Sequence, residues 1–299
     1  MREAVMTDSV ARPLTLVGFG PVGRCIVGRA GPAADIRLIG RGWPYPGVEL
    51  PGARMDLDVP GQTLGDPLAG RFLIVSVPPS RNGNVDLRTA NLVSAIDSRI
   101  RRTGEMPAGL LYVSTTGVYG DCGGDWVDES RPVNPGTARA RRRVSAEQQW
   151  IEAAERWSVP WTVLRVPGIF ACDKLDAARV AQGAPVIAPE QASWSNRVHI
   201  EDLADACLIL ARPGAPTGVF NISDGNPSTL TEYSWALADY FGLPRAPVAD
   251  RETVLANASP MLREFLSESK RVDSGRLRAA IGWQPRYPDL ETALASCPR

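Results

Sequence analysis

Residues 14–24 read LTLVGFGPVGR, an apolar run that leads directly into three spaced glycines. Four apolar or β-branched residues before a glycine-rich turn are typical of a buried strand, and the residues from Pro21 onward are typical of a following helix. In the pattern Gly18-x-Gly20-x-x-Gly23, the first glycine allows a tight turn and the second lets the backbone approach a diphosphate. The third lets the helix pack closely against the strand. This stretch predicts a strand–turn–helix unit that binds a dinucleotide.

The first turn of the predicted helix is suited to a phosphate group. Its backbone N–H groups have no partner within the helix and together carry about half a positive charge. We therefore expect Gly18, Gly20, Pro21, Val22 and Gly23 to hold the diphosphate. A glycine-rich turn without a ligand is the alternative, and the position between a strand and a helix near the amino terminus argues against it.

Composition narrows the classes of protein to which the chain can belong. Its 299 residues are 44% hydrophobic with a formal net charge of zero, which suits one large or two smaller domains and gives no reason to expect nucleic-acid or membrane binding. The first thirteen residues lack the apolar stretch of a signal peptide. Five scattered cysteines without a C-x-x-C pair, and a single histidine, predict no metal site, no disulfide framework and a cytoplasmic location.

Apolar segments recur along the first half of the chain and predict further strands at 36–39, 53–57, 71–77, 109–115 and 161–166. Helical patterns over 85–101 and 137–157 lie between several of them. Strands that alternate with helices imply an α/β fold with a Rossmann-type, doubly wound parallel sheet. In such a sheet the ligand crevice lies at the carboxyl ends of the strands.

The chain is expected to have two parts. Residues 1–166 would form the dinucleotide-binding domain, with a returning segment near 196–222, and residues 167–299 would form mostly a smaller substrate-binding lobe. In this second part, helices are predicted at 174–181, 200–211, 230–241 and 260–267, and one strand at 218–222. The lobe would close over the crevice and bind a second substrate.

Residues at the predicted strand ends are candidates for contact with the coenzyme. Besides the glycine turn they are Arg41, Asp56, Leu57, Val77, Pro78, Pro79, Ser114, Pro167, Gly168 and Ile169. Arg41 stands where NAD-specific sites usually carry a carboxylate, and a guanidinium favours a 2′-phosphate, so we expect NADP in preference to NAD. A solvated loop arginine is the alternative. Asp56 has two alternative roles, a hydrogen bond from the adenine amino group or the capping of a turn.

Four further motifs carry a resemblance to a known family. They are LYVSTTGVYG at 111–120, NRVHIEDLA at 196–204, NISDG at 221–225 and IGWQP at 281–285. With the glycine turn they resemble, in order and over nearly the whole length, the extended short-chain dehydrogenases, the NAD-dependent epimerase/dehydratase group. The resemblance implies an NAD(P)-dependent enzyme and says nothing of its substrate.

The resemblance implies a role for Thr115 and also contains one departure. A Ser or Thr at this position in the family hydrogen-bonds the reacting oxygen, so Thr115 would polarise it, with simple packing as the alternative. The family's Tyr-x-x-x-Lys on the following helix is replaced by Thr137 and Arg141. A threonine hydroxyl is a far poorer proton donor than a phenol, and an arginine cannot release a proton near neutrality. The chain therefore resembles an atypical member that lacks the usual acid–base pair.

Other groups are candidates for proton transfer and for contact with substrate. Tyr119, His199 or the substrate itself would transfer the proton, although the motif around His199 favours a structural hydrogen bond. Thr116, Trp126 and Arg197 are candidate substrate contacts. Trp126 would stack on the substrate or tuck under its own loop, and Arg197 would suit an anionic or phosphate-bearing group.

The leading interpretation is an NAD(P)-dependent oxidoreductase or epimerase/dehydratase acting on a small polar or nucleotide-linked alcohol or carbonyl compound. Its candidate catalytic residues are Thr115, Thr137, Arg141 and Tyr119. The alternative is a non-catalytic NAD(P)-binding sensor or regulatory protein that keeps the fold without the acid–base pair. A small-molecule substrate is expected in the first case, and a homodimer is left open.

Overall fold

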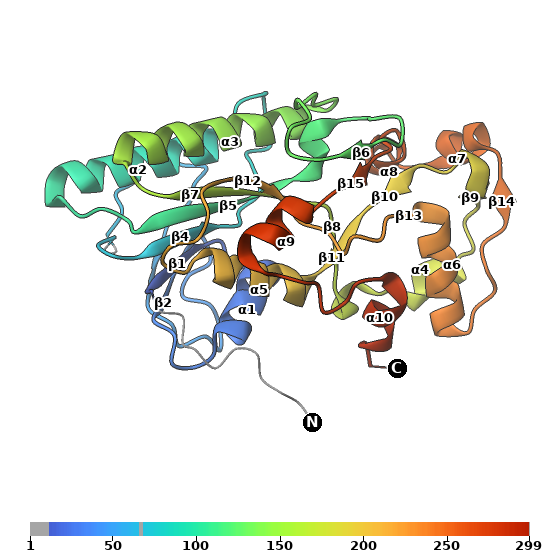
Figure 1. The fold of residues 1–299 in the computed structure, drawn as a ribbon, viewed down its shortest axis with the longest axis horizontal. Coiled ribbons are helices and arrows are strands. Elements are labelled where there is room, and N and C mark those ends of the chain that lie inside the picture. Colours follow the sequence, from blue (N-terminus) through green and yellow to red (C-terminus); the bar gives the residue numbers. More distant parts are fainter. Residues whose placement is uncertain (1–11, 66–67, 299) are drawn as a thin grey trace. The chain divides into compact units, whose positions relative to one another are not determined.

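The computed structural model describes residues 12–65 and 68–298, and contacts within the chain divide it into two compact units (Figure 1). The first unit consists of Met1–Thr115, Ala138–Arg165 and Leu203–Phe220, and the second of Thr116–Thr137, Val166–Asp202 and Asn221–Arg299. The first eleven residues, in which we expect no signal peptide, lie outside the described residues. Among the residues described, no helix has the length and apolar character needed to cross a membrane.

The first unit is built on a seven-stranded sheet. Its strands are β1 (Leu14–Val17), β2 (Ile36–Gly40), β3 (Gly52–Arg54), β4 (Phe72–Val75), β5 (Gly109–Thr115), β7 (Trp161–Val166) and β12 (Gly218–Asn221). They lie in the order β12-β7-β5-β4-β1-β2-β3, and the pairs β1–β2, β1–β4, β2–β3 and β4–β5 run parallel. The strand order reverses between β1 and β4, which is where ligands bind in such sheets. The predicted α/β class with a Rossmann-type sheet is confirmed.

Helices cover both faces of this sheet. Figure 1 shows α2 (Leu87–Thr103) and α3 (Ala138–Trp157) on one face, and α1 (Pro21–Ala30) and α5 (Ile200–Leu210) on the other. Leu92, Ile96 and Trp150 belong to the buried cluster that packs α2 and α3 against the central strands. On the opposite face an ion pair of 2.7 Å between Arg29 and Asp205 joins α1 to α5.

The second unit contains short strands joined in pairs and a set of mostly short helices. Its strand pairs are β8 (Gly168–Phe170) with β11 (Arg197–His199), β10 (Trp194–Ser195) with β13 (Ser228–Thr229), β9 (Val186–Ile187) with β14 (Val248–Ala249), and β6 (Trp126–Val127) with β15 (Arg271–Val272). Its helices are α4 (Ala177–Ala181), α6 (Leu230–Phe241), α7 (Arg251–Asn257), α8 (Pro260–Leu266), α9 (Gly275–Ile281) and α10 (Leu290–Ala295). Single 3₁₀ turns occupy Thr116–Tyr119, Cys172–Lys174 and Pro189–Gln191. Phe170, Leu237 and Leu294 belong to the apolar cluster that packs α6 and α10 together.

Most of the predicted elements are present, and the differences have local causes. The strand predicted at 53–57 is shorter, because the chain turns at Asp56, whose carboxylate accepts from the N–H of Asp58 at 3.1 Å. This is the capping role, one of the two alternatives for Asp56. The helix predicted from residue 174 begins only after Asp176, whose side chain caps it. The two-residue strands of the second unit are too short to produce an alternating pattern, so the sequence does not predict them.

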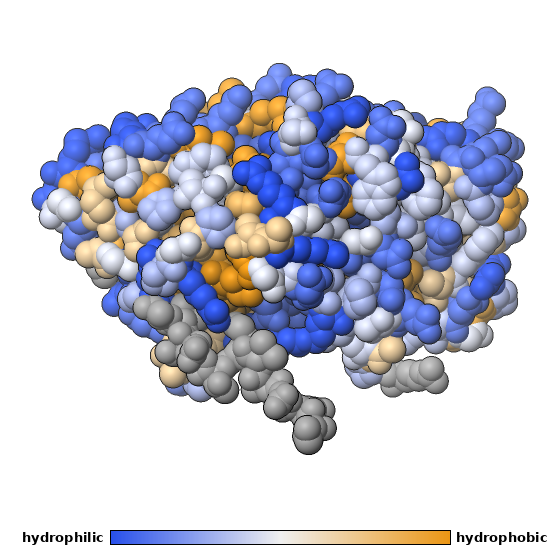
Figure 2. Space-filling view, viewed as in Figure 1, coloured by the Kyte–Doolittle hydropathy of each residue, from blue (hydrophilic) through white to orange (hydrophobic). Residues whose placement is uncertain are grey.

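The face drawn in Figure 2 carries mostly hydrophilic residues, with apolar residues in small groups between them. Large apolar side chains that are about half exposed include Val59, Leu87, Trp126, Val248 and Phe265. They come from separate segments of the chain, as is normal for single apolar residues at the surface of a folded protein.

The glycine turn between β1 and α1 has no room for a side chain at two of its positions. Gly18 has a φ of +95°, and a Cβ there would lie 2.8 Å from Cγ1 of Val77. A Cβ on Gly23 would lie 2.6 Å from the carbonyl oxygen of Gly18. Gly23 thus lets the helix approach the end of β1, and Gly18 lets the turn approach the loop after β4.

Gly23→Ala should destabilise the chain by about 1–3 kcal/mol, because the added methyl group meets a backbone oxygen. Gly28→Ala is the matched control in the same helix, where a Cβ meets no atom within 4 Å and alanine should stabilise by up to about 1 kcal/mol. Urea unfolding of both variants and of the unaltered chain measures the difference. Equal stabilities of the two variants would contradict the packing argument.

Candidate functional site

A cavity of about 420 Å³ lies in the first unit at the carboxyl ends of β1, β2 and β4. Its walls are the glycine turn, the end of β2, the turn after β3 and the loop after β4. The predicted coenzyme residues among its lining are Gly18, Gly20, Arg41, Asp56, Leu57, Val77 and Pro78. Pro21, Val22 and Gly23 form the first turn of α1 beside it, and Pro79 follows in the loop after β4. The structure thus brings segments far apart in the sequence to one cavity.

Gly20 is the N-cap of α1, and its surroundings differ from those of the other two glycines. A Cβ built on Gly20 meets no atom within 4 Å, and its φ of −80° is open to any residue. Packing within the protein therefore does not require glycine here, whereas a group bound against the first turn would require it. That turn has no side-chain cap and no acidic residue, so its N–H groups suit an anion.

Charged side chains gather at the rim of this cavity. Asp58 accepts two hydrogen bonds of 2.6 Å from Arg88, and the guanidinium of Arg41 lies 3.7 Å from the same carboxylate. Arg88 also donates to the carbonyl oxygen of Pro78 at 3.1 Å, which ties the loop after β4 to α2. The hydrogen bonds from Arg88 hold the pKa of Asp58 below its usual value, so this carboxylate is ionised at neutral pH.

A neighbouring cavity of about 630 Å³ shares Arg41, Asp58 and Arg88 with the first. Its further lining consists of Pro60, Ser80, Arg81, Asn82, Leu87 and Asn91. Sequence reasoning missed Arg81 and Arg88, because neither follows a strand directly. No sequence pattern marks the pairing of Arg88 with an aspartate thirty residues earlier.

Ser114 is turned into the core of the first unit. Its hydroxyl donates to Glu147 on α3, and Glu147 is paired with Arg165 of β7 at 2.8 Å. All three residues are buried. The side chain of Ser114 therefore joins β5 to α3 and β7, so any contact with a coenzyme would have to come from its backbone. No sequence pattern marks the roles of Glu147 and Arg165.

Three consecutive arginines of α3 donate to other parts of the first unit. Arg141 donates to the side chain of Asn84 at 3.0 Å. Arg142 donates to the carbonyl oxygen of Gly83 at 2.7 Å. Arg143 donates to the hydroxyl of Tyr112 at 2.8 Å, and burial raises the pKa of that phenol to about 12. Arg141 is thus held against the loop after β4, and its catalytic role stays a prediction.

The other predicted catalytic residues lie in separate elements. Thr115 is the last residue of β5 and is half-buried, and Thr137 stands just before α3. Thr116 and Tyr119 belong to the first 3₁₀ turn of the second unit. The buried hydroxyl of Tyr119 donates to Oδ1 of Asn221 at 2.8 Å, which is a structural contact. The catalytic roles of Thr115, Thr137 and Tyr119 stay predictions.

In the second unit, Arg197 lies beside the segment Pro167–Ile169 that was predicted to contact the coenzyme. The parallel pair β8–β11 places Arg197 opposite Gly168. Its guanidinium lies 4.3 Å from the ring centroid of Tyr233 and donates to the hydroxyl of Ser228. These contacts come from three different elements, β8, β13 and α6.

Arg197 is a buried cation without a carboxylate partner among residues 12–65 and 68–298. It is 8% exposed, and within that part of the chain its Nη2 atom has no hydrogen-bond partner. Burial lowers the pKa of Arg197 and raises the pKa of the nearby Asp224 to about 6. A buried charge without a paired counter-charge is costly, so an anionic group bound here would stabilise it.

Trp126 is 52% exposed and lies against an arginine of the second unit. The guanidinium of Arg271 is 5.4 Å from the ring centroid of Trp126 and 5.3 Å from that of Trp194. Arg271 also donates to the carbonyl oxygen of Gly124, in the loop that carries Trp126. Both alternatives for Trp126 stay open, because one part of the ring is packed and the other part is accessible.

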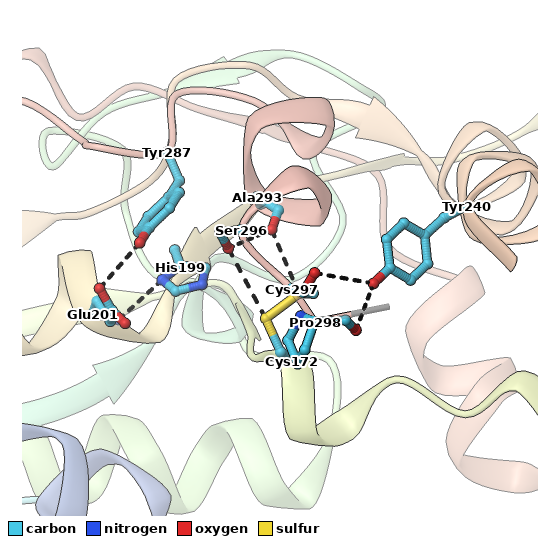
Figure 3. Close-up of a disulfide and its surroundings, with 9 residues drawn as sticks. All are labelled: Cys172, His199, Glu201, Tyr240, Tyr287, Ala293, Ser296, Cys297 and Pro298. Atoms are coloured by element: carbon cyan, nitrogen blue, oxygen red, sulfur yellow. Dashed lines mark hydrogen bonds between the residues drawn. A yellow bond between two sulfur atoms is a disulfide. The ribbon is translucent and has the colours of Figure 1, made fainter.

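His199 is buried and packs against the rings of Phe170 and Tyr287, the second of which Figure 3 shows. Its Nδ1 accepts from the N–H of Glu201 at 3.2 Å, and its ring centroid is 3.9 Å from that of Tyr287. Burial lowers the pKa of His199, which favours the neutral imidazole. These contacts support the structural role that the motif favoured.

A disulfide joins Cys172 to Cys297 in the second unit, with a Cα–Cα distance of 5.3 Å (Figure 3). The sequence predicted no disulfide framework, and that prediction missed this bond. The two cysteines are 125 residues apart, and only folding brings the end of α10 against the turn after β8. The hydroxyl of Tyr240 accordingly donates to the carbonyl oxygen of Cys297 at 3.3 Å. Among the described residues, no group of three or more His, Cys, Asp and Glu side chains is placed to hold a metal.

Comparison with known proteins establishes the fold. The chain matches no protein-family model and no curated protein. It is similar to the structure of a conserved protein of unknown function from Silicibacter pomeroyi, with 28% identity over 96% of this chain and 98% of that one, and a TM-score of 0.77. A candidate NAD-dependent epimerase/dehydratase from Methylobacillus flagellatus is 22% identical over 95% of this chain and 97% of its own, with a TM-score of 0.69. RMD from Pseudomonas aeruginosa, solved with NADPH, is 20% identical over 95% of each chain, with a TM-score of 0.68.

The disulfide predicts the number of accessible thiols. Denatured protein alkylated without reductant should gain three labels, on Cys25, Cys122 and Cys207, and five after reduction. Cys172→Ser should show a fourth label without reductant, while reduction should lower the stability of the chain by about 2–5 kcal/mol. Mass spectrometry counts the labels, and five labels without reductant would contradict the disulfide.

Proposed function

We propose that the chain is an NAD(P)-dependent oxidoreductase or epimerase/dehydratase acting on a small polar or nucleotide-linked alcohol or carbonyl compound. The observation that carries the proposal is Gly20, whose missing side chain leaves the first turn of α1 open at the cavity of the first unit. The order of the sequence motifs supports the proposal. So do the fold neighbours, one of which was solved with NADPH.

The residues at the cavity fit a dinucleotide in chemical terms. The N–H groups of Val22 and Gly23 and the dipole of α1 favour a diphosphate beside Gly20. The side chain of Arg41 is 67% exposed, so it can turn toward a 2′-phosphate, which favours NADP over NAD. The bound coenzyme supplies a nicotinamide that accepts or donates a hydride.

The residues of this chain would bind the substrate and polarise its reacting oxygen. Thr115 would donate a hydrogen bond to that oxygen as negative charge develops on it. Arg141 keeps its proton near neutrality, so it would act as a fixed positive charge. Thr137, just before the same helix, would orient the substrate by a hydrogen bond.

The second unit would supply recognition of an anionic substrate. Arg197 is a buried cation with one unpartnered nitrogen in the described chain, which suits a carboxylate or phosphate group. The accessible part of the Trp126 ring would stack on a sugar or base, and Thr116 would contact the same ligand. A cytoplasmic location and a homodimer remain predictions.

A specific observation favours a second candidate, an NAD(P)-binding sensor without turnover. Thr137 and Arg141 replace the family's acid–base pair, and the hydroxyl of Tyr119 is committed to Asn221. If the substrate does not supply its own proton, the site has no efficient donor. The coenzyme cavity would then report coenzyme levels to a partner.

Gly20→Val should weaken binding of NADPH and NADH by about tenfold or more, because the side chain would fill the space beside the first turn of α1. Folding should be intact, since a Cβ at Gly20 meets nothing within 4 Å. Isothermal calorimetry measures the affinities, with Gly28→Ala as a variant of the same helix that should bind normally. Failure of the unaltered protein to bind either coenzyme would overturn the proposed function.

Thr115→Val should lower kcat by about a hundredfold on any substrate found in a carbonyl and alcohol panel, since a donor to the reacting oxygen is lost. The dissociation constant of the coenzyme should be unchanged. Thr115→Ser keeps the hydroxyl and should retain most of the activity. A loss of less than about tenfold in the valine variant would remove Thr115 from the chemistry, and coenzyme binding without turnover on the whole panel would favour the sensor.

A further inference from the structure

Asp58 presents a problem for any phosphate at the rim of the coenzyme cavity. Its carboxylate lines both cavities of the first unit and lies 3.7 Å from the guanidinium of Arg41. An unscreened carboxylate at this place would repel a phosphate and would attract Arg41 to itself. Recognition of a 2′-phosphate by Arg41 therefore requires that another group neutralise Asp58.

Arg88 is built to neutralise this carboxylate. Its Nε and one terminal nitrogen each donate to a different oxygen of Asp58 at 2.6 Å, in the two-pronged geometry that suits a guanidinium. The remaining nitrogen donates to the carbonyl oxygens of Pro78 and Pro79 at 3.1 and 3.4 Å. The side chain of Arg88 is only 14% exposed, so the surrounding structure holds it in this position.

The other arginines at the rim are held less firmly. Arg41 makes one longer contact to Asp58, and its side chain is 67% exposed. Arg81 lines the larger cavity from the loop after β4 and is exposed. With Asp58 matched by Arg88, these two guanidiniums outnumber Asp56, the other carboxylate that lines the smaller cavity, and leave an excess of positive charge at the rim.

We propose that Arg88 is a positioning residue that sets coenzyme selectivity: by neutralising Asp58 it leaves Arg41 and Arg81 to bind the 2′-phosphate of NADPH. This inference rests on the proposed function and extends it. Arg88 acts through Asp58 and does not itself touch the phosphate. The adenosine end of the site would thus owe its preference to a residue on α2, as well as to the arginine after β2.

The test is a set of dissociation constants for NADPH and NADH, measured by calorimetry on the full chain. Arg88→Leu leaves Asp58 unmatched and should weaken NADPH by about tenfold or more, while NADH changes by less than about threefold. Asp58→Asn alone should keep the preference for NADPH. The double variant Arg88→Leu with Asp58→Asn should recover it, because the carboxylate beside Arg41 is then absent.

The double variant separates charge from loop support. It lacks the hydrogen bonds to Pro78 and Pro79 just as Arg88→Leu does, so recovery can come only from the loss of the carboxylate. Arg101→Leu is the matched control. It removes one positive charge from the exposed last turn of the same helix, where Arg101 donates to Ser98, and should leave both affinities unchanged.

Each outcome of these measurements either supports or overturns the role of Arg88. Equal weakening of NADPH and NADH by Arg88→Leu, or a double variant that stays impaired, would assign Arg88 to loop support and overturn the inference. A preference of the unaltered chain for NADH would overturn it while leaving coenzyme binding intact. Absence of binding to either coenzyme would instead overturn the proposed function on which the inference rests.

Discussion

The closeness of α1 to β1 is the constraint on which the site depends. It exists because Gly23 has no side chain, so that the first turn of the helix can pack against the carbonyl oxygen of Gly18 at the strand end, while the missing side chain of Gly18 makes room for Val77 after β4. The same contact directs the amides of that turn to the carboxyl ends of the central strands, where the sheet order reverses. Gly20 lies between these two positions, but a Cβ there would meet no atom of the protein within 4 Å. Packing therefore explains glycine at positions 18 and 23, whereas glycine at position 20 would be explained by a bound group.

The charged side chains near the strand ends differ in how closely each is paired with an opposite charge. Glu147 and Arg165 form a buried pair in the core, and Asp58 and Arg88 form a partly exposed pair at the cavity rim. Arg41 is the least restrained of these groups. A guanidinium can donate hydrogen bonds to a carboxylate and to backbone carbonyl oxygens at the same time, as Arg88 does. A chain rich in arginine can therefore combine structural ion pairs with an excess of positive charge.

The fold could be predicted from sequence wherever a local pattern decides it. The run 14–24 predicts β1 and the start of α1 as they are observed, because buried strands and glycine turns leave a strong signature. The disulfide of Cys172 with Cys297 could not be predicted, since nothing local links residues so far apart. The short strand pairs of the second unit depend on tertiary contacts in the same way.

For the candidate site, the sequence predicts only residues that directly follow a strand. It singled out Gly20 and Arg41, which line the cavity, and also Ser114, whose hydroxyl is turned into the core. Alternation of strands and helices says which positions lie at an edge, but it does not say which way a side chain turns. Arg88 and Arg81 were missed because they come from a helix and a loop that the strand-end rule does not cover.

The two units are interleaved along the chain, each made of three segments, so the backbone passes between them five times. No single cut can release either unit whole. A fragment ending near residue 166 would lack β12 and the whole of α5, leaving the edge of β7 unpaired and one face of the sheet partly bare. To replace one unit by that of another protein, all three of its segments would have to be exchanged together, so fusion at a single point cannot do it.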